Sequence, residues 1–364
     1  MTTSPVAAVV AMRAYRAGRS PRIVQQELGV ADADRLASNE SPYGPLPSVI
    51  EALSKATESV NRYPGVRAVD LISEIARQHN IDVENVIAGP GSAGVLWQLA
   101  TAYLGADRHM VSPTPSFEGY PLIAQLTGTR LTQVSLRDHT VHVSDLLDAI
   151  ADDTALAVIA EPNNPTGTAV GSDALEDLIA GTRDRCLLVI DEAYVEFQAE
   201  TSRSIERAMA EDHVVVLRTF SKAFGLAALR VGYAVGNSDV LSYIDRVAAP
   251  FSVTAHAEAA AIASLNHSVE LAKRVGNTVA ERERVADALR RDGWECLDSH
   301  TNFVFLPISD SATDIAAALE RVGVITRPIA GIGLRVTIGS PQENDRFLAG
   351  LTAIAVARAG LVFH

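Results

Sequence analysis

The sequence predicts an α/β fold: a large domain with a mostly parallel seven-stranded sheet between helices, and a smaller α+β domain. Short apolar runs alternate with helical patterns in the first two thirds of the chain, which is typical of parallel strands joined by crossover helices. From about residue 253 the pattern changes to long alanine-rich helices. The 364 residues, 48% of them hydrophobic, are enough to form one large core and a smaller second core.

Seven apolar runs predict the strands of the large sheet. Each is rich in Val, Ile, Leu or Ala and short enough for a strand buried on both faces. Helical stretches separate several of them, for example at 93–104 and at 172–182, where Ser172 is the expected N-cap. The seven runs are VIAG (86–89), HMVSP (109–113), LTQVSL (131–136), LAVIAEP (156–162), CLLVIDEA (186–193), VVVLRTF (214–220) and VGYAVG (231–236).

The smaller domain is expected to combine the C-terminal part of the chain with the N-terminal arm. Its helical patterns reach Arg291 and are followed by the apolar runs FVFLPI (303–308) and GLRVTIG (333–339), with a helix between the two runs. No linker of low complexity marks a boundary, so we draw it where the pattern changes. We expect the large domain at 41–252 and the smaller domain at 1–40 and 253–364.

The charge balance disfavours nucleic acid as a partner. The chain has 31 Lys and Arg against 44 Asp and Glu, a net charge of −13, and no basic stripe interleaved with aromatic residues. No run approaches the ~20 apolar residues that span a bilayer, and the N-terminus lacks a charged region before its short apolar stretch. We expect a cytoplasmic protein without a membrane partner.

Neither the cysteines nor the histidines form a metal-binding pattern. Cys186 and Cys296 are far apart and match no ligand spacing, so we expect free thiols and no disulfide. His139 and His142 in HTVH have no supporting ligand cluster, and a solvated loop is the better interpretation. We predict no metal site.

Polar groups follow several predicted strands at their carboxyl ends, where ligands bind in an open parallel sheet. The run 86–89 leads into GPGSAG and a helix, so the backbone N–H groups of Gly91, Ser92 and Ala93, together with the helix dipole, can hold a phosphate. Taken alone, this loop is equally well explained as a tight turn between a strand and a helix.

Four further side chains follow other strands of the same sheet. Asn164 precedes a proline and is biased to an extended conformation that can direct its amide inward. Asp191 follows an apolar run, where a carboxylate is costly unless a cation or donors satisfy it, and Tyr194 lies three residues further on. Lys222 comes just after the run 214–220, and taken alone it would be read as a solvated cation.

Together these groups match the requirements of pyridoxal 5′-phosphate. Lys222 is predicted to bind the cofactor as a Schiff base and then to move a proton between the substrate Cα and C4′ of the cofactor. Asp191 would keep the pyridinium nitrogen protonated, which makes the ring an electron sink. Asn164 and Tyr194 would contact the phenolic oxygen. The predicted phosphate ligands are Ser92, Ser221 and Arg230, the arginine through paired hydrogen bonds.

Seven segments carry a resemblance to a known family. They are ASNESPYGPLPS, NRYPG, GPGSAG, EPNNPTG, VIDEAYVEF, RTFSKAFGLAALRVGYAVG and LRVTIGSPQEND. They resemble the fold-type I aminotransferases, specifically the histidinol-phosphate aminotransferase subfamily and its aromatic amino acid (phenylalanine) aminotransferase branch. The resemblance extends from about residue 15 to residue 357 and implies a transferase of nitrogenous groups that depends on pyridoxal phosphate.

The resemblance implies a homodimer whose active sites lie at the subunit interface. Tyr63 of NRYPG would reach the phosphate of the neighbouring subunit's cofactor. Phe117 of PSFEGY would stack on the pyridine ring, where relatives commonly have tyrosine. Thr219 and Ser221 are similar to the family's hydroxyls on the phosphate side. GSAG lacks the acidic residue that many relatives carry, but the backbone donors of the phosphate cup remain, so we expect cofactor binding to survive.

The same resemblance implies the substrate contacts. Arg335 in GLRVTIG matches the arginine that pairs with the acidic group of the substrate, and Arg327 in ITRP is a second cation. Tyr15 and Asn39 are implied near the substrate mouth. The stretch 327–335, RPIAGIGLR, is short compared with many histidinol-phosphate enzymes, a difference that affects the pocket for the distal group of the substrate.

We therefore expect transamination between an aromatic amino acid, phenylalanine or tyrosine, and 2-oxoglutarate by a ping-pong mechanism. The first alternative is the histidinol-phosphate aminotransferase of histidine biosynthesis. A second is another reaction of the same cofactor, such as decarboxylation of a phosphorylated amino acid, because fold does not determine reaction. A third is a relative without catalysis, against which the intact Lys222, Asp191 and Arg230 argue.

Overall fold

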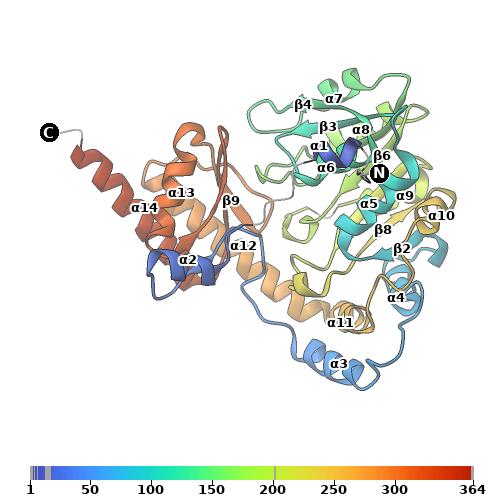
Figure 1. Ribbon diagram of the computed structural model, residues 1–364, viewed down its shortest axis with the longest axis horizontal. Coiled ribbons are helices and arrows are strands. Elements are labelled where there is room, and N and C mark those ends of the chain that lie inside the picture. Colours follow the sequence, from blue (N-terminus) through green and yellow to red (C-terminus); the bar gives the residue numbers. More distant parts are fainter. Residues whose placement is uncertain (1–2, 4, 6, 13–17, 201, 362–364) are drawn as a thin grey trace.

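The described residues form two parts, each built around a main sheet that is covered by helices (Figure 1). A third sheet, with only two strands, lies in the smaller part. The computed structural model describes residues 3, 5, 7–12, 18–200 and 202–361. The larger part contains a seven-stranded sheet between helices, and the smaller part contains a three-stranded antiparallel sheet with long helices. The predicted α/β fold class is confirmed.

The large sheet contains all seven predicted strands, with ends within two residues of the predicted ones. Their order across the sheet is β2-β8-β7-β6-β5-β3-β4, and β8 alone runs antiparallel to its neighbours. The strands are β2 (Val86–Gly89), β3 (His109–Thr114), β4 (Arg130–Ser135), β5 (Thr154–Ala160), β6 (Leu187–Asp191), β7 (Val214–Thr219) and β8 (Gly232–Gly236).

The reversed direction of β8 follows from its connection. Only residues 220–231 join β7 to β8, and within them the structure has a single 3₁₀ turn, η3 (Ala227–Leu229). A parallel connection requires a crossover of a dozen or more residues, usually with a helix. This link is at that lower limit and contains no α-helix, and it turns the chain back on itself. The register pairs Gly89 with Gly232 and Gly232 with Thr219, so the carboxyl ends of β2 and β7 lie at the same edge.

Helices cover both faces of the large sheet because alternate strand residues face opposite sides. Val214 and Val216 belong to the core under one helix layer, whereas Val215 and Leu217 belong to the core under the other. The first layer contains α3 (Pro47–Thr57), α4 (Val69–His79), α7 (Val143–Ala149), α8 (Ser172–Thr182), α9 (Ser204–Ala210) and α11 (Ala255–Leu265). The second contains α5 (Gly91–Tyr103), α6 (Gly119–Thr127) and α10 (Ser238–Arg246).

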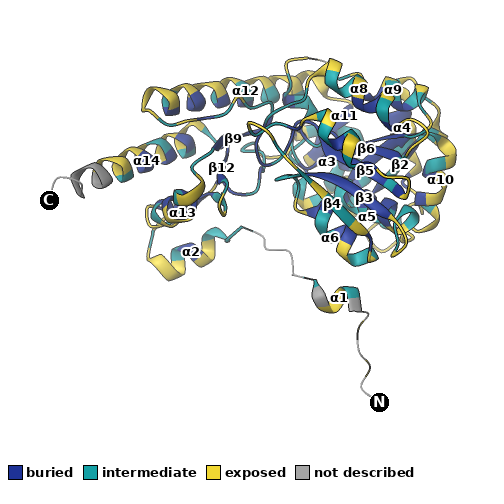
Figure 2. Ribbon diagram, turned by 90° about the horizontal axis from the view of Figure 1, so that it is seen from above, coloured by how far each residue is buried: buried dark blue, intermediate teal, exposed yellow. Residues whose placement is uncertain are grey.

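The smaller part joins the N-terminal arm to the C-terminal residues. Strand β1 (Asp34–Arg35) pairs in parallel with β10 (Val324–Ile325), and Leu36 is buried in the same core as Val304 and Val336. Figure 2 shows buried residues concentrated in the strands, with exposed residues along the outer sides of α12 and α14.

The remaining elements of the whole described chain complete the list. They are β9 (Phe303–Leu306), β11 (Arg327–Ile329), β12 (Gly333–Thr337), α1 (Ala7–Ala11), α2 (Pro21–Leu28), α12 (Ser268–Arg291), α13 (Ala312–Glu320), α14 (Pro341–Leu361), η1 (Val83–Asn85), η2 (Val195–Phe197) and η4 (Ser309–Ser311).

The division of the chain at residue 252 stays a prediction. Helix α11 lies beyond that boundary, yet its residues Ala257 and Ala261 belong to the core that α3 and α4 form on the large sheet. Packing therefore groups α11 with the larger part.

The expected N-cap of α8 is wrong. The capping residue is Gly171, and the Ser172 hydroxyl donates to the Glu200 carboxylate at 3.4 Å instead of accepting from the helix. A glycine with φ of 83° can make the sharp entry into this helix, so Ser172 becomes the first helical residue. Helix α5 likewise begins at Gly91, two residues before the predicted start, so Ser92 and Ala93 lie in its first turn.

Within the described ranges, no helix has the length and apolar character that crossing a membrane requires.

Candidate active site

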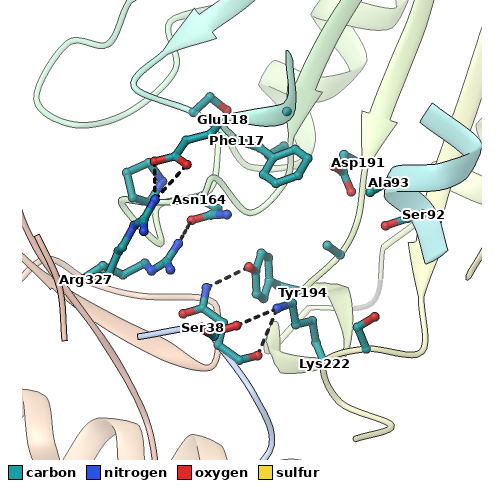
Figure 3. Close-up of a pocket in the computed structure, with 18 of the residues that line it drawn as sticks. Ser38, Ser92, Ala93, Phe117, Glu118, Asn164, Asp191, Tyr194, Lys222 and Arg327 are labelled. Atoms are coloured by element: carbon teal, nitrogen blue, oxygen red, sulfur yellow. Dashed lines mark hydrogen bonds and ion pairs between the residues drawn. The ribbon is translucent and has the colours of Figure 1, made fainter. Parts of the chain in front are cut away.

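A cavity of about 670 Å³ lies at the carboxyl edge of the large sheet, facing the small sheet (Figure 3). Strand ends, the loop after β1 and strands β11 and β12 all contribute to its lining. Thirteen of the predicted site residues line it: Asn39, Ser92, Ala93, Phe117, Asn164, Asp191, Tyr194, Thr219, Ser221, Lys222, Arg230, Arg327 and Arg335.

Lys222 lies in the loop between β7 and β8, with its amine directed into the cavity (Figure 3). The amine donates to the backbone carbonyls of Ser38 at 3.1 Å and Asn39 at 3.2 Å. Burial, reinforced by the positive charge of Arg335, lowers the pKa of Lys222 from 10.5 to about 7. An amine with this pKa is partly neutral at physiological pH and can act as a nucleophile or a base.

Asp191 ends β6 and presents an unsatisfied oxygen to the cavity. Its Oδ2 accepts a hydrogen bond from the Tyr120 hydroxyl at 3.2 Å, whereas its Oδ1 is buried and has no hydrogen-bond partner among the described residues. Burial raises the pKa of Asp191 to about 6, and the Tyr120 hydrogen bond opposes that rise. A buried carboxylate oxygen of this kind requires a donor. The protonated ring nitrogen of pyridoxal phosphate is such a donor.

Tyr120 is a site residue that sequence reasoning missed. It lies in the first turn of α6 and is fully buried, and it is 71 positions before Asp191. The tyrosine is part of the motif PSFEGY, which follows β3. No local feature of the sequence indicates that its hydroxyl reaches β6, which lies two strands away from β3 in the sheet. It fixes one oxygen of Asp191 and leaves the other for a ligand.

An anion site forms where α5 begins. Gly91 has φ of 82°, and a Cβ at this position would lie 2.6 Å from the guanidinium of Arg230, so glycine allows the cation to approach the helix N-terminus. Arg230 donates to the Ser221 hydroxyl at 3.2 Å, and Ser221 accepts from Thr219 at 3.0 Å. The N–H groups of the first helical turn, including Ser92, complete the set. This donor set fits a phosphate.

Phe117 forms a wall of the cavity. Its ring packs edge to face on Tyr120, with centroids 5.5 Å apart, and a Cβ on Gly119 would lie 2.4 Å from it. The ring is therefore held in place, with room beside it for a flat ligand. The stacking role predicted for Phe117 stays a prediction.

Asn39 connects Tyr194 to the lysine loop. Its amide nitrogen donates to the Tyr194 hydroxyl at 2.9 Å, and its amide oxygen accepts from Thr337 at 3.0 Å. Its carbonyl accepts from the amine of Lys222 at 3.2 Å. Asn39 is only 1% exposed, so the structure gives this residue an organising position, and its implied contact with substrate stays a prediction.

The two predicted arginines lie opposite one another on paired strands, with Arg327 of β11 in register with Arg335 of β12. Arg335 donates to the amide oxygen of Asn164 and, at 2.7 Å, to the carbonyl of Ala37. Arg327 donates from one nitrogen to both carboxylate oxygens of Glu118, at 2.8 and 2.9 Å. Glu118 is a second residue that sequence reasoning missed, since 209 positions separate it from Arg327.

Tyr63, which the resemblance places at the cofactor of the neighbouring subunit, lies on the surface of its own chain. Tyr63 is 84% exposed and stacks on Phe251, with centroids 4.8 Å apart. It does not line the cavity of its own chain. Its role across a subunit interface stays a prediction. Tyr15 lies outside the described residues.

The described residues contain no group of three or more His, Cys, Asp and Glu side chains placed to hold a metal ion. His142 is exposed, whereas His139 is half-buried with its ring centroid 6.2 Å from that of Phe305. Cys186 and Cys296 are both free thiols, and burial raises the pKa of each to about 11.

Residues 33–351 match the family described as aminotransferase class I and II. The chain belongs to this family. Among its relatives are the aromatic amino acid aminotransferases of Streptomyces coelicolor and Thermobifida fusca, each 44% identical to it. The first alignment covers 87% of this chain and 89% of the relative, and the second covers 86% and 88%.

A solved structure extends the likeness to the fold. The histidinol-phosphate aminotransferase of Sinorhizobium meliloti, in complex with pyridoxal 5′-phosphate, superposes with a TM-score of 0.89 at 25% identity. The alignment covers 98% of this chain and 99% of that one. The chain is thus an aminotransferase that depends on pyridoxal phosphate. The free Oδ1 of Asp191 and the anion site beside Arg230 fit this cofactor.

Proposed function

We propose that this aminotransferase moves the amino group of phenylalanine or tyrosine to 2-oxoglutarate by a ping-pong mechanism. The observation that carries the proposal is that Lys222, with a pKa of about 7, lines one cavity together with Asp191 and the arginine pair. The names of the relatives at 44% identity support an aromatic donor. Trp97 and Ile329, which also line the cavity, offer apolar surface to an aromatic side chain.

Lys222 is the residue that attaches the cofactor and later carries the proton. Bound pyridoxal phosphate supplies an electron sink for the electrons left when a proton leaves the substrate Cα. The lysine amine accepts that proton and can return it to the neighbouring carbon, because a pKa of about 7 lets it gain and lose a proton at neutral pH. The carbonyls of Ser38 and Asn39 orient the amine.

Asp191 and the anion site hold the cofactor in position for this transfer. The Oδ1 atom of Asp191 would keep the ring nitrogen protonated, while Tyr120 fixes the other oxygen of the carboxylate. Ser92, Thr219, Ser221 and Arg230 would bind the phosphate, and Ala93 would add a backbone N–H. Phe117 would cover the ring, and Asn164 and Tyr194 would contact its phenolic oxygen. Because these groups are preorganised, they need not rearrange when charge develops.

The arginine pair allows two different substrates to use the same pocket in turn. Arg335 is oriented by Asn164 and Ala37 and is suited to the α-carboxylate, which every amino acid and 2-oxo acid shares. Arg327 lies beside it and can meet the second carboxylate of 2-oxoglutarate. Tyr15 and Asn39 remain candidates for the substrate mouth.

The second candidate function is that of a histidinol-phosphate aminotransferase. It is favoured by the superposition on the enzyme from Sinorhizobium meliloti and by the presence of two arginines able to meet a phosphate. Decarboxylation of a phosphorylated amino acid is a further, weaker alternative on the same scaffold.

A comparison of donors tests the proposal. With 2-oxoglutarate held constant, we expect kcat/KM to be higher for phenylalanine and tyrosine than for histidinol phosphate, because Trp97 and Ile329 give the lining apolar surface and Arg327 already holds a carboxylate. Formation of glutamate measures transamination, and release of carbon dioxide measures decarboxylation. A hundredfold preference for histidinol phosphate would overturn the ranking of donors and leave the transaminase chemistry standing.

We also propose that two chains form a homodimer with shared active sites. Tyr63 and Phe251 form an exposed aromatic pair, and Val66 and Val69 nearby in the sequence are exposed as well. Exposed apolar surface of this kind is typical of a subunit interface. Light scattering that returned the mass of a single chain would contradict this proposal.

A further inference from the structure

The carboxylate of Glu118 occupies one of the two substrate-facing arginines. Glu118 directly precedes α6, and Arg327 is the first residue of β11, so the ion pair joins the larger part to the smaller part across the cavity (Figure 3). One nitrogen of Arg327 meets both oxygens of Glu118, at 2.8 and 2.9 Å. Both side chains line the cavity.

Arg335 and Arg327 donate to groups of different charge. Arg335 donates to an amide oxygen and a backbone carbonyl, which orient a guanidinium without adding negative charge. Arg327, opposite it in the strand register, donates to a full carboxylate. Glu118 thus adds a negative charge beside Arg327, which the oxygens of Asn164 and Ala37 do not add beside Arg335.

The exposure of the pair makes the contact replaceable. The side chain of Glu118 is 50% exposed, whereas that of Arg327 is 17% exposed. An ion pair with one partner half in water contributes little, because the exposed carboxylate is nearly as well solvated when it turns away. A substrate carboxylate can therefore take the place of Glu118, and the partly buried arginine keeps an anionic partner throughout.

We propose that Glu118 determines specificity as a detachable counter-ion of Arg327. The proposal rests on the proposed function, in which one pocket accepts a neutral aromatic side chain and then an acidic one. When an aromatic side chain is present, Glu118 neutralises the charge of Arg327 beside the ring. When 2-oxoglutarate enters, its second carboxylate displaces Glu118. While Glu118 holds Arg327, it disfavours acidic and phosphorylated side chains, because these must first displace its carboxylate.

The test is equilibrium binding of unreactive substrate analogues to the cofactor-loaded enzyme, measured by calorimetry. Glutarate stands for 2-oxoglutarate, and 3-phenylpropionate stands for phenylalanine. Glu118→Gln keeps the size of the side chain and removes its charge. Glutarate should bind roughly fivefold more tightly to this variant, because it no longer competes with an intramolecular carboxylate. Binding of 3-phenylpropionate should not tighten in this variant, because its ring makes no ion pair with Arg327 and therefore does not compete with Glu118.

The chain offers a closely matched control. Asp153 accepts from one nitrogen of Arg130 through both carboxylate oxygens, at 2.7 and 2.6 Å, and its side chain is also 50% exposed. Neither residue lines the cavity. Asp153→Asn removes the same charge from the same kind of ion pair, and both dissociation constants should stay as in the wild type.

A double-mutant cycle assigns the effect to Arg327. In an Arg327→Gln background, adding Glu118→Gln should leave glutarate affinity unchanged, because the cation through which Glu118 acts is gone. The proposal is overturned by unaltered glutarate binding in Glu118→Gln, by an equal change in Asp153→Asn, or by persistence of the effect without Arg327. Binding of glutarate requires no turnover. If the assay with aromatic donors fails, the proposed function is rejected, but the glutarate measurement still decides whether Glu118 is a detachable counter-ion of Arg327.

Discussion

Replacing Lys222 by alanine is expected to abolish covalent attachment of pyridoxal phosphate and to lower the rate of transamination by roughly a thousandfold or more. The amine both attaches the cofactor and carries the proton, so one substitution removes two functions. The cofactor should still bind non-covalently, because the anion site at α5 and Arg230 is untouched. Absorbance spectra and single-turnover rates measure the two effects.

The chain offers matched controls for this experiment. Its other two lysines, Lys55 on α3 and Lys273 on α12, are both exposed. Alanine at either position should leave attachment and turnover unchanged. Borohydride reduction followed by peptide mapping should locate the cofactor on Lys222 in the wild type. A map that placed the cofactor on Lys55 or Lys273 would contradict the assignment of Lys222 as the attachment site.

The rate of attachment should also depend on pH through the lysine. With a pKa lowered to about 7 by burial, the amine of cofactor-free protein is protonated and unreactive well below pH 7 and neutral well above it. Covalent attachment should therefore accelerate as pH rises through about 7 and then level off. A midpoint near the ordinary value of 10.5 would show that the amine is solvated rather than buried.

Replacing Asp191 by asparagine is expected to slow proton abstraction by roughly a hundredfold or more while leaving the fold intact. An amide is similar in size to a carboxylate, but it cannot keep the ring nitrogen protonated, so the electron sink weakens. Single-turnover rates of the cofactor-loaded variant measure this effect directly. A rate close to that of the wild type would mean that the carboxylate is structural.

Thermal unfolding of the cofactor-free protein separates chemistry from stability in this variant. Burial raises the pKa of Asp191 from 3.8 to about 6, so folding favours its protonated form. At pH 7 the ionised carboxylate, with one oxygen lacking a partner, lowers the stability of the cofactor-free protein. Asp191→Asn should therefore unfold at the same temperature as the wild type or higher at pH 7. This difference should shrink as pH falls below about 6.

Much of the fold and the cofactor site could be predicted because their causes are local. A parallel strand buried on both faces must be a short apolar run. The seven predicted runs marked all seven strands of the large sheet, although β4 at its edge has no buried residue. The carboxyl ends of parallel strands meet at one edge, so Asp191 at the end of β6 and Lys222 after β7 had to lie near one another. The prediction of Ser172 as a cap failed, since the backbone of Gly171 decides where α8 begins.

The pairings that complete the site were decided by the tertiary structure alone. Tyr120 meets Asp191 across 71 positions, and Glu118 meets Arg327 across 209 positions and between the two parts of the molecule. Residue type and spacing describe which face of an element a side chain occupies, but not which distant side chain shares its space. The sequence by itself thus predicted the strands and the cofactor, and thirteen of the site residues that it predicted line one cavity. The fold decided which oxygen of Asp191 is left for a ligand, because α6 packs on the large sheet and brings Tyr120 to the other oxygen. It also brought Glu118 to Arg327, because that contact forms only when the two parts pack together.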